Sequence, residues 1–186
     1  MSIDWRPPTL HAPRLLLRAL TVDDADAVFA YAGNPAVTRF TLWDTHKSRD
    51  DSLEFVRDYA LSHYLEMQPD PYAICLKNEP ERVIGTIGCF WNTRLNRTME
   101  LGYALGELHW GQGITVEAGR ALLTHVFASY DVERIQARCT AENTASTRVM
   151  QKLGMSCEGC LRSSLFHRER FWDMNLYSML RREWRG

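Results

Sequence analysis

The sequence lacks long apolar runs and an excess of charge of either sign. Its longest apolar segments, such as Leu15 to Leu17 and Val83 to Ile87, are far shorter than the ~20 residues that cross a bilayer. The 22 basic and 23 acidic residues are well mixed and leave a formal net charge of −1, so the composition gives no reason to expect nucleic acid or an anionic membrane as a partner. Met1 to Asp4 show no signal-peptide pattern. We expect a soluble cytoplasmic protein.

The sequence also lacks the paired cysteines and clustered histidines of a disulfide or metal framework. Its five cysteines, an odd number, are scattered through apolar segments, which favours reduced thiols. Cys157 and Cys160 form an isolated C-x-x-C pair, for which buried or half-buried thiols are a better interpretation than zinc. The histidines show no metal-ligand spacing. We predict no metal site.

The chain has the length and composition of one domain, with 186 residues of which 45% are hydrophobic. We predict a single domain over residues 1–186. Periodicity and turn residues predict the order β-α-α-β-β-β-α-β-α-β-β. The predicted strands are 14–20, 72–77, 82–91, 99–105, 134–140, 155–161 and 171–180, and the predicted helices are 25–32, 49–64, 115–130 and 145–153. This order indicates an α/β fold with a mixed sheet flanked by helices, in which helix 115–130 is the crossover between parallel strands.

A short glycine turn precedes the clearest predicted helix. The segment Trp110-Gly-Gln-Gly-Ile-Thr115, called the glycine turn below, lies between strand 99–105 and helix 115–130. Free N–H groups and the positive end of a helix can hold phosphate oxygens there, and Gly111 and Gly113 can adopt positive φ and leave the amides open. An ordinary strand-to-helix turn explains the pattern equally well. No Lys-Ser/Thr follows to make a P-loop, and a dinucleotide fingerprint lacks its third glycine.

The sequence resembles the acetyl-coenzyme A core of the GNAT superfamily, in the branch of the RimJ and RimL ribosomal-protein N-acetyltransferases. The resemblance spans nearly the whole chain and is carried by Pro13-Arg-Leu-Leu-Leu-Arg18, Leu101-Gly-Tyr-Ala-Leu105, Trp110-Gly-Gln-Gly-Ile-Thr-Val-Glu-Ala118, Asn143-Thr-Ala-Ser146 and Lys152-Leu-Gly-Met155. It implies a GNAT-type fold and transfer of an acetyl group from acetyl-CoA to an amine. The acceptor would be a protein N-terminus or a small-molecule amine, and the protein a monomer or homodimer.

The resemblance implies roles for the matched residues of the cofactor site. The strand that ends at Leu105 would separate from strand 134–140, and the pantetheine arm would bond the backbone near Leu105. The glycine turn and the helix start would hold the pyrophosphate, through Gly111, Gln112, Gly113, Thr115 and Val116.

Two residues near helix 145–153 are implied as contacts of the reacting end. Asn143 would contact the pantetheine or the acyl group, and Ser146 would donate a proton to the departing thiolate. Both are also good N-cap residues for that helix. Many members of the family place a tyrosine acid where this chain has Met150, which cannot act as one, so Ser146 becomes the candidate acid.

The remaining questions are which residue acts as the general base and whether a side chain of the protein acts as a nucleophile. Glu100 is the first choice for the base because it shares a strand face with the small residues Gly102 and Ala104, although a solvated carboxylate fits equally well. Second choices are Glu107 and His109. Some members of the family place a carboxylate between the last two strands, where this chain has none from Ser163 until Glu169. No Cys or Ser belongs to a recognisable triad, and Cys139 reads as a plain buried thiol. We therefore predict direct attack in a ternary complex, without an acyl-enzyme.

Two further functions are consistent with the sequence. One is a module that binds acyl-CoA as a sensor without turnover, which Met150 and the uncertain base motivate. The other is a nucleotide-binding α/β domain that binds ATP or NAD. Four aromatic residues are candidates for an acceptor cleft, although core packing explains them equally well: Phe40, Trp43, Tyr64 and Trp91.

Overall fold

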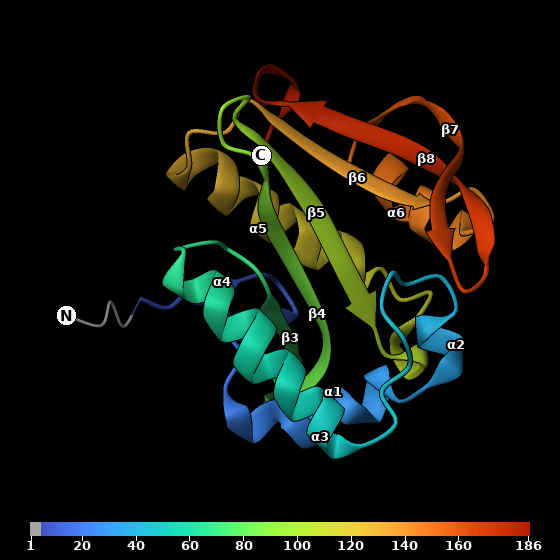
Figure 1. The fold of residues 1–186 in the computed structure, drawn as a ribbon. Helices are drawn as coiled ribbons and strands as arrows, with labels where there is room; N and C mark the ends of the chain where they lie inside the picture. The colour runs from blue at the N-terminus through green and yellow to red at the C-terminus, as the bar shows by residue number, and fades with distance from the viewer. Residues whose placement is uncertain (1–4) are drawn as a thin grey trace.

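A single eight-stranded sheet with helices on both faces makes up the computed structural model, which describes residues 5–186 (Figure 1). Residues 1–4, on which the signal-peptide expectation falls, lie outside the described residues. The strand order is β1-β2-β3-β4-β5-β6-β8-β7, with β5 and β6 as the parallel neighbours. The strands are β1 (Leu10–His11), β2 (Leu15–Ala19), β3 (Tyr72–Leu76), β4 (Glu79–Thr93), β5 (Thr98–Leu105), β6 (Arg134–Thr140), β7 (Ser156–His167) and β8 (Arg170–Leu180). The predicted mixed sheet is confirmed.

The helices cover the two faces of this sheet in separate groups (Figure 1). They are α1 (Ala25–Ala32), α2 (Pro35–Thr38), α3 (Arg49–Glu54), α4 (Leu61–Leu65), α5 (Ile114–Ser129) and α6 (Thr144–Lys152). On one face, α5 buries Leu122, Leu123 and Val126 completely, each worth ~1.5–3 kcal/mol of transfer free energy. On the other face, the segment from α3 to α4 packs with α1 over β3 and β4, burying Val56 and Tyr64. No helix among residues 5–186 is long and apolar enough to span a membrane.

Two short elements, β1 and α2, are additions to the predicted order. The Gly33-Asn34-Pro35 segment ends α1 as predicted, but it also starts α2. Asn34 caps this helix by accepting a hydrogen bond from the Ala36 amide, and Pro35 occupies its first turn. The predicted helix 49–64 consists of α3, a π-helical segment (Phe55–Ala60) and α4. Its buried residues still recur on one side, so hydrophobic periodicity does not reveal the wider turn.

The last hairpin is longer than predicted, and this changes the surroundings of two cysteines. β7 continues to His167, past the predicted end at Leu161, and most of its side chains are exposed. A strand open to solvent on both faces has no apolar alternation that would mark its end. Cys157 and Cys160 lie on this edge strand and are exposed, so the prediction that they are buried or half-buried is wrong. The other three cysteines are buried free thiols.

Candidate active site

The glycine turn enters α5 with its amides open to solvent. Gly111 and Gly113 have φ angles of 73° and 76°, and Gly113 is the N-cap of α5. Glycine adopts this left-handed conformation without strain. Within residues 5–186, the amides of residues 113–116 have no hydrogen-bond acceptor, as expected for the first turn of a helix. A Cβ added at Gly111 would meet nothing within 4 Å, so an anion can approach the turn closely.

An arginine from the N-terminal part of the chain supports this turn. The Arg14 guanidinium donates to the Gln112 carbonyl at 3.1 Å and pairs with the Glu117 carboxylate at 2.6 Å. Its Nη2 would lie 3.8 Å from a Cβ at Gly113. The Arg14 amide also donates to Glu117. Arg14 therefore fixes the turn and adds positive charge beside the helix N-terminus, where a phosphate is favoured.

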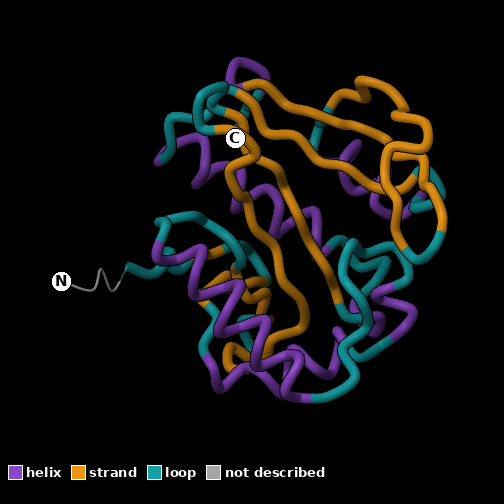
Figure 2. Tube along the Cα trace, viewed as in Figure 1, coloured by secondary structure: helices purple, strands orange, loops and turns teal. Residues whose placement is uncertain are grey.

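The parallel strands β5 and β6 diverge next to the glycine turn. They pair only through residues 98–100 and 134–136 and then separate (Figure 2). Residues 101–105 and 137–140 therefore have no strand partner on the sides that face each other, among the residues described. We call this opening the fork. The Leu105 carbonyl, where a pantetheine contact is predicted, accepts a hydrogen bond from Trp110 Nε1 at 2.7 Å.

A tyrosine on β5 spans the fork to reach α6. The Tyr103 and Ser146 hydroxyl oxygens are 2.7 Å apart, although the two residues are 43 positions apart in sequence. Burial raises the pKa of Tyr103, so its hydroxyl stays protonated at neutral pH. No catalytic or binding role was predicted for Tyr103 from the sequence. One signal was available: Tyr103 alternates with Met99 and Leu101 on the apolar face of β5, and a buried hydroxyl there needs a partner.

The other residues that were considered near α6 either cap this helix or lie in the core. Asn143 is the N-cap of α6, and its side chain accepts from the Ser146 amide at 3.1 Å. Ser146 itself lies inside α6, with its hydroxyl on Tyr103. Met150 is fully buried. Burial raises the pKa of the Cys139 thiol, which keeps it protonated and is consistent with a plain buried thiol.

Glu100 lies at the point where the fork begins. It is the last β5 residue paired with β6, opposite Gln136, and it is 6% exposed. Both carboxylate oxygens are engaged: Oε1 pairs with Arg138 Nε at 3.0 Å, and Oε2 accepts from Gln136 at 2.9 Å. Asn92 Nδ2 adds a weaker contact at 3.4 Å. Glu100 is thus held inside a polar network.

The other residues considered for the base lie at two separate places. The second choices, Glu107 and His109, are both in the 3₁₀ turn Glu107–His109 before the glycine turn, and Glu107 accepts a hydrogen bond from Asn34 at 2.8 Å. Glu169 is at the tip of the β7–β8 hairpin, exposed and with positive φ. Within residues 5–186, no hydrogen bond joins Glu107 or Glu169 to Glu100.

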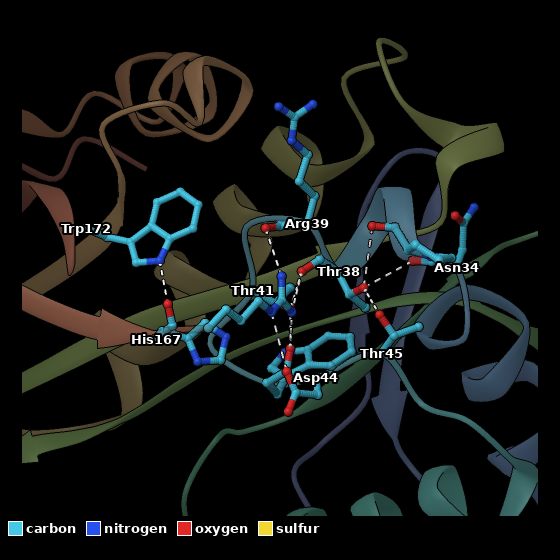
Figure 3. A network of polar contacts seen from close by, with 11 residues as sticks. Asn34, Thr38, Arg39, Thr41, Asp44, Thr45, His167 and Trp172 are labelled. Carbon is cyan, nitrogen blue, oxygen red and sulfur yellow. Dashed lines mark hydrogen bonds and ion pairs between the residues drawn. The ribbon is translucent and has the colours of Figure 1, made fainter. Parts of the chain in front are cut away.

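The hairpin tip is fastened to the loop between α2 and α3. Arg168 donates to the backbone carbonyls of Thr38, Arg39 and Trp43 at 3.0–3.1 Å and pairs with Asp44 at 3.4 Å. Figure 3 shows Thr38, Arg39 and Asp44 grouped in this network, with His167 and Trp172 nearby. We call this set of contacts the clasp. It joins segments that are 124 to 130 residues apart.

A groove of about 770 Å³ runs between the loop after α2 and the helices from α3 to α4. Of the four aromatic residues suggested by the sequence, Trp43 lines this groove. Phe40 packs edge-on against Trp172 near the clasp, with ring centres 6.5 Å apart. Trp91 lies beside the Arg94 guanidinium, and Tyr64 is wholly buried in the core. The other groove residues are Asp44, Thr45, His46, Lys47, Asp51, Glu54, Phe55, Asp58, Tyr59 and Ser62.

Known proteins share this architecture along its full length. The family profile described as "Acetyltransferase (GNAT) domain" matches residues 14–156. The uncharacterized N-acetyltransferase p20 of Bacillus licheniformis is 34% identical over 182 residues, which cover 96% of this chain and 99% of that protein. The ribosomal-protein-serine acetyltransferase of Escherichia coli is 36% identical over 100 residues, which cover 54% of this chain and 56% of that protein.

Solved structures agree with these sequence matches. A GNAT-family acetyltransferase from Bacillus anthracis superposes with a TM-score of 0.85 at 27% identity, covering 95% of this chain and 100% of that one. RimL, a ribosomal L7/L12 alpha-N-protein acetyltransferase in complex with coenzyme A, has a similar fold, with a TM-score of 0.82 at 24% identity over 93% of this chain and 98% of that one. The chain belongs to the GNAT acetyltransferase family, in a RimJ/RimL-like branch, and is an acyltransferase.

Proposed function

We propose that the protein transfers the acetyl group of acetyl-CoA to a primary amine by direct attack in a ternary complex. The observation that carries the proposal is the fork, which opens after three paired residues beside the free amides of the α5 N-terminus. A diphosphate at the amides and an extended arm in the fork would satisfy groups that the protein leaves unpaired. This donor set fits coenzyme A.

The residues divide between binding and proton transfer. The amides of Gln112, Gly113, Thr115 and Val116 hold the pyrophosphate, with Gly111 leaving space and Arg14 adding charge. The free edge of β5 up to Leu105 and the Asn143 side chain position the arm. When bound, acetyl-CoA supplies an activated thioester carbonyl.

A partly buried hydroxyl pair is the candidate for protonating the leaving sulfur. The Ser146 hydroxyl, bonded to Tyr103, is the proposed donor of that proton, and Tyr103 replenishes it. Cys139 is the thiol of β6, and its raised pKa favours direct attack over an acyl-cysteine. Glu100 is the base predicted from the sequence, and this role stays a prediction.

The acceptor is an amine of a protein N-terminus or of a small molecule. One relative is named a ribosomal-protein-serine acetyltransferase, which supports testing peptides with a free N-terminal serine first. Fold alone does not choose between acceptors. An acceptor panel should therefore combine such peptides with amino acids and polyamines.

Cofactor titration of wild type and Gly113→Glu tests the proposal. The carboxylate would enter the phosphate position, so we expect acetyl-CoA affinity to fall by on the order of 100-fold, or ~2.7 kcal/mol. Gly113→Ala adds a Cβ without charge at a positive φ that strains any side chain, so its loss of affinity measures the backbone part of the effect and should be smaller than that of Gly113→Glu. Leu95→Glu adds the same charge at a site that is 93% exposed in the turn between β4 and β5, and this control should keep the wild-type affinity. Isothermal titration and the cofactor-dependent rise in Tm measure it.

Release of the coenzyme A thiol, followed with the acceptor panel, tests turnover. Acceptor-dependent release supports the acetyltransferase. Tight cofactor binding without such release with any amine identifies a sensor instead. Unchanged affinity in Gly113→Glu would refute the cofactor site, and stabilisation by ATP or NAD in place of acetyl-CoA would support the nucleotide-binding alternative.

A further inference from the structure

A histidine and a buried aspartate form a pair on the face of the sheet that α1, α3 and α4 cover. His63 lies in α4, and Asp70 lies in the loop before β3. His63 Nδ1 is 2.6 Å from Asp70 Oδ2, and the Tyr59 hydroxyl donates to the same oxygen at 2.8 Å. Asp70 is 4% exposed, whereas the His63 side chain is 20% exposed. A buried carboxylate therefore orients an imidazole that a ligand can reach.

The hydrogen bonds fix which ring nitrogen is free. A carboxylate oxygen only accepts, so Nδ1 of His63 carries the hydrogen, and neutral His63 presents its lone pair at Nε2. Nε2 has no hydrogen-bond partner within the described part of the chain. Burial, followed by the charge of Asp70, raises the pKa of Tyr59, which keeps that hydroxyl a donor. This is the arrangement in which a carboxylate holds an imidazole ready to accept a proton.

The pair lies one strand away from the fork. Asp70 Oδ1 occupies the space over Gly88, where a Cβ would come within 1.9 Å of it. Gly88 of β4 lies directly opposite Gly102 of β5, two residues beyond Glu100, and directly opposite residues point to the same face of a sheet. Adjacent strands are ~4.8 Å apart, so the pair lies over the strand next to β5, on the face that carries Glu100 and Gly102.

The ring of His63 lies beside an aromatic residue of β4. Its centre is 6.4 Å from that of Phe90, whose Cε1 is the nearest atom to a Cβ at Gly102, at 3.7 Å. Phe90 is directly opposite Glu100, as Gly88 is opposite Gly102. His63 is therefore on the Glu100 face of the sheet, and the Phe90 ring neighbours both His63 and Gly102.

The groove leads an acceptor toward this pair. Tyr59 lines the groove and holds Asp70, and its ring is 4.2 Å from that of His63, centre to centre. Glu54 and Asp58 line the same groove, and both are exposed. Their carboxylates favour the approach of a positively charged ammonium group. Such a group must lose a proton before it can act as a nucleophile.

We infer that His63, oriented by Asp70, is the base that deprotonates the acceptor ammonium; this rests on the proposed acetyltransferase function. Nε2 takes one proton from the ammonium and passes it to solvent. The freed nitrogen pair forms the N–C bond, the C–S bond breaks, and the sulfur gains a proton from Ser146. The nitrogen loses its second proton to solvent water, and solvent returns one proton to Ser146 through Tyr103. Each turnover thus yields the amide and the free thiol, with one proton released.

Glu100 is less suited to this task because its oxygens are occupied. Arg138 and Gln136 donate to Oε1 and Oε2, so protonating Glu100 would break an ion pair in a buried site. The His63 Nε2 position has no such contact to lose. Glu100 instead keeps Arg138 and Gln136 fixed at the start of the fork.

Rescue of a truncated histidine distinguishes catalysis from a structural role. His63→Ala should lower kcat with an amine acceptor by on the order of 100-fold, leave acetyl-CoA affinity within about twofold, and regain at least about tenfold of the lost rate on adding imidazole. The control His11→Ala changes an exposed residue of β1. It should keep the wild-type kcat and show no response to imidazole. Glu100→Gln, measured alongside, tests the competing base.

A spectroscopic readout tests the pair without turnover. Nitrogen-15 spectra of histidine-labelled protein should show neutral His63 as the Nδ1–H tautomer. Asp70→Asn should change that signature and lower kcat by at least about tenfold, with acetyl-CoA affinity reporting whether this variant is folded.

The outcomes separate the two proposals. An Nε2–H tautomer, wild-type turnover in His63→Ala, or a loss that imidazole does not restore overturns the role of His63 and leaves the acetyltransferase intact. No acceptor-dependent thiol release by the wild-type protein with any amine removes both. Imidazole rescue together with the expected tautomer establishes His63 as the base.

Discussion

The hydrogen bond between the Tyr103 and Ser146 hydroxyls connects the two sides of the fork. Tyr103 comes from β5 and Ser146 from α6, and their oxygens are 2.7 Å apart. Because each hydroxyl can donate or accept, a proton lost by Ser146 can be replaced by Tyr103. The pair should therefore behave as one unit.

Substitution of this pair tests its role in protonating sulfur. Ser146→Ala should lower kcat by about 10- to 100-fold, within the range of a lost general acid, and change acetyl-CoA affinity less. Tyr103→Phe should have a smaller effect, and the double variant should lose less than the product of the two, because the residues are coupled. Steady-state kinetics measure all three, with Ser129→Ala at the end of α5 as the control. Unchanged turnover in Ser146→Ala would remove it as the acid.

Single residues differ in how well the sequence predicts them. Gly111, Gly113 and the Asn143 cap follow from local rules, because positive φ and N-capping depend on immediate neighbours. The hydrogen-bond partner of Tyr103 could not be predicted, since it is 43 residues away in the sequence. His63 and Asp70 are seven residues apart, yet their contact depends on how the loop before β3 returns over Gly88.

At the scale of elements, the clasp joins the β7–β8 hairpin to the loop that lines one side of the groove. One guanidinium bonds three carbonyls of that loop and one carboxylate. Arginine suits this position because its planar fork offers several fixed donors. The loop is also held by the edge-on contact of Phe40 with Trp172 of β8 and by the hydrogen bond from Thr41 to the Trp43 carbonyl, and the clasp adds the polar contacts that join Trp43 and Asp44 to the hairpin tip.

Removal of the clasp should affect acceptor binding more than cofactor binding. Arg168→Ala should raise the KM for the amine by about tenfold through the lost charge-assisted hydrogen bonds and leave acetyl-CoA affinity unchanged. Arg168→Lys should recover only part of the loss, since an ammonium cannot bond the same carbonyls in one plane. Arg162→Ala, exposed on the same hairpin, is the control. An unaltered KM in Arg168→Ala would mean that the loop holds its shape alone.

Elements with local signals were predicted best. The apolar stripe of α5 and the alternation of β6 place both elements within one residue of their observed bounds. The π-helical segment, the length of β7 and the clasp were not predicted. Each depends on tertiary contacts or on exposed residues that carry no periodicity.

At the scale of the whole molecule, an ion pair near the sheet edge contributes to stability in acid. Arg134 of β6 forms a two-bond pair with Glu158 of β7, and Ser178 of the intervening β8 donates to the same carboxylate. Arg134 and Ser178 together lower the pKa of Glu158 from 4.5 to about 2. A carboxyl whose pKa is depressed on folding stabilises the protein above its unfolded pKa and loses that effect as pH falls toward the folded value.

The free energy of unfolding should show this window. Glu158→Gln should be less stable than wild type by about 1 kcal/mol at pH 7, a figure reduced for solvent screening, and the difference should shrink between about pH 4.5 and 2. Urea unfolding across this range measures it. Glu79→Gln, which breaks an exposed pair with Arg82, should cost under ~0.5 kcal/mol. A Glu158→Gln deficit that persisted undiminished at low pH would contradict the assignment.

The overall architecture was predictable because the order of strands and helices restricts the topology. A long helix between two strands is typical of a parallel crossover, and β5, α5 and β6 form one. The family resemblance supplied the separation of those strands. The register at which they part depends on the residues around Glu100 and Gln136, and local propensity does not encode that position.

The fork also divides the sheet mechanically. Strands β1 to β5 form one block and β6, β8 and β7 the other. Within residues 5–186, strand pairing between the blocks is limited to residues 98–100 and 134–136, and the Glu133 and Arg134 amides add two backbone bonds to the Arg97 carbonyl. Such a short joint resists twisting far less than a full ladder would. A molecule that binds in the gap and forms hydrogen bonds to both blocks would therefore stiffen the joint between them. Occupancy of the site and stiffness of the whole sheet would then rise together.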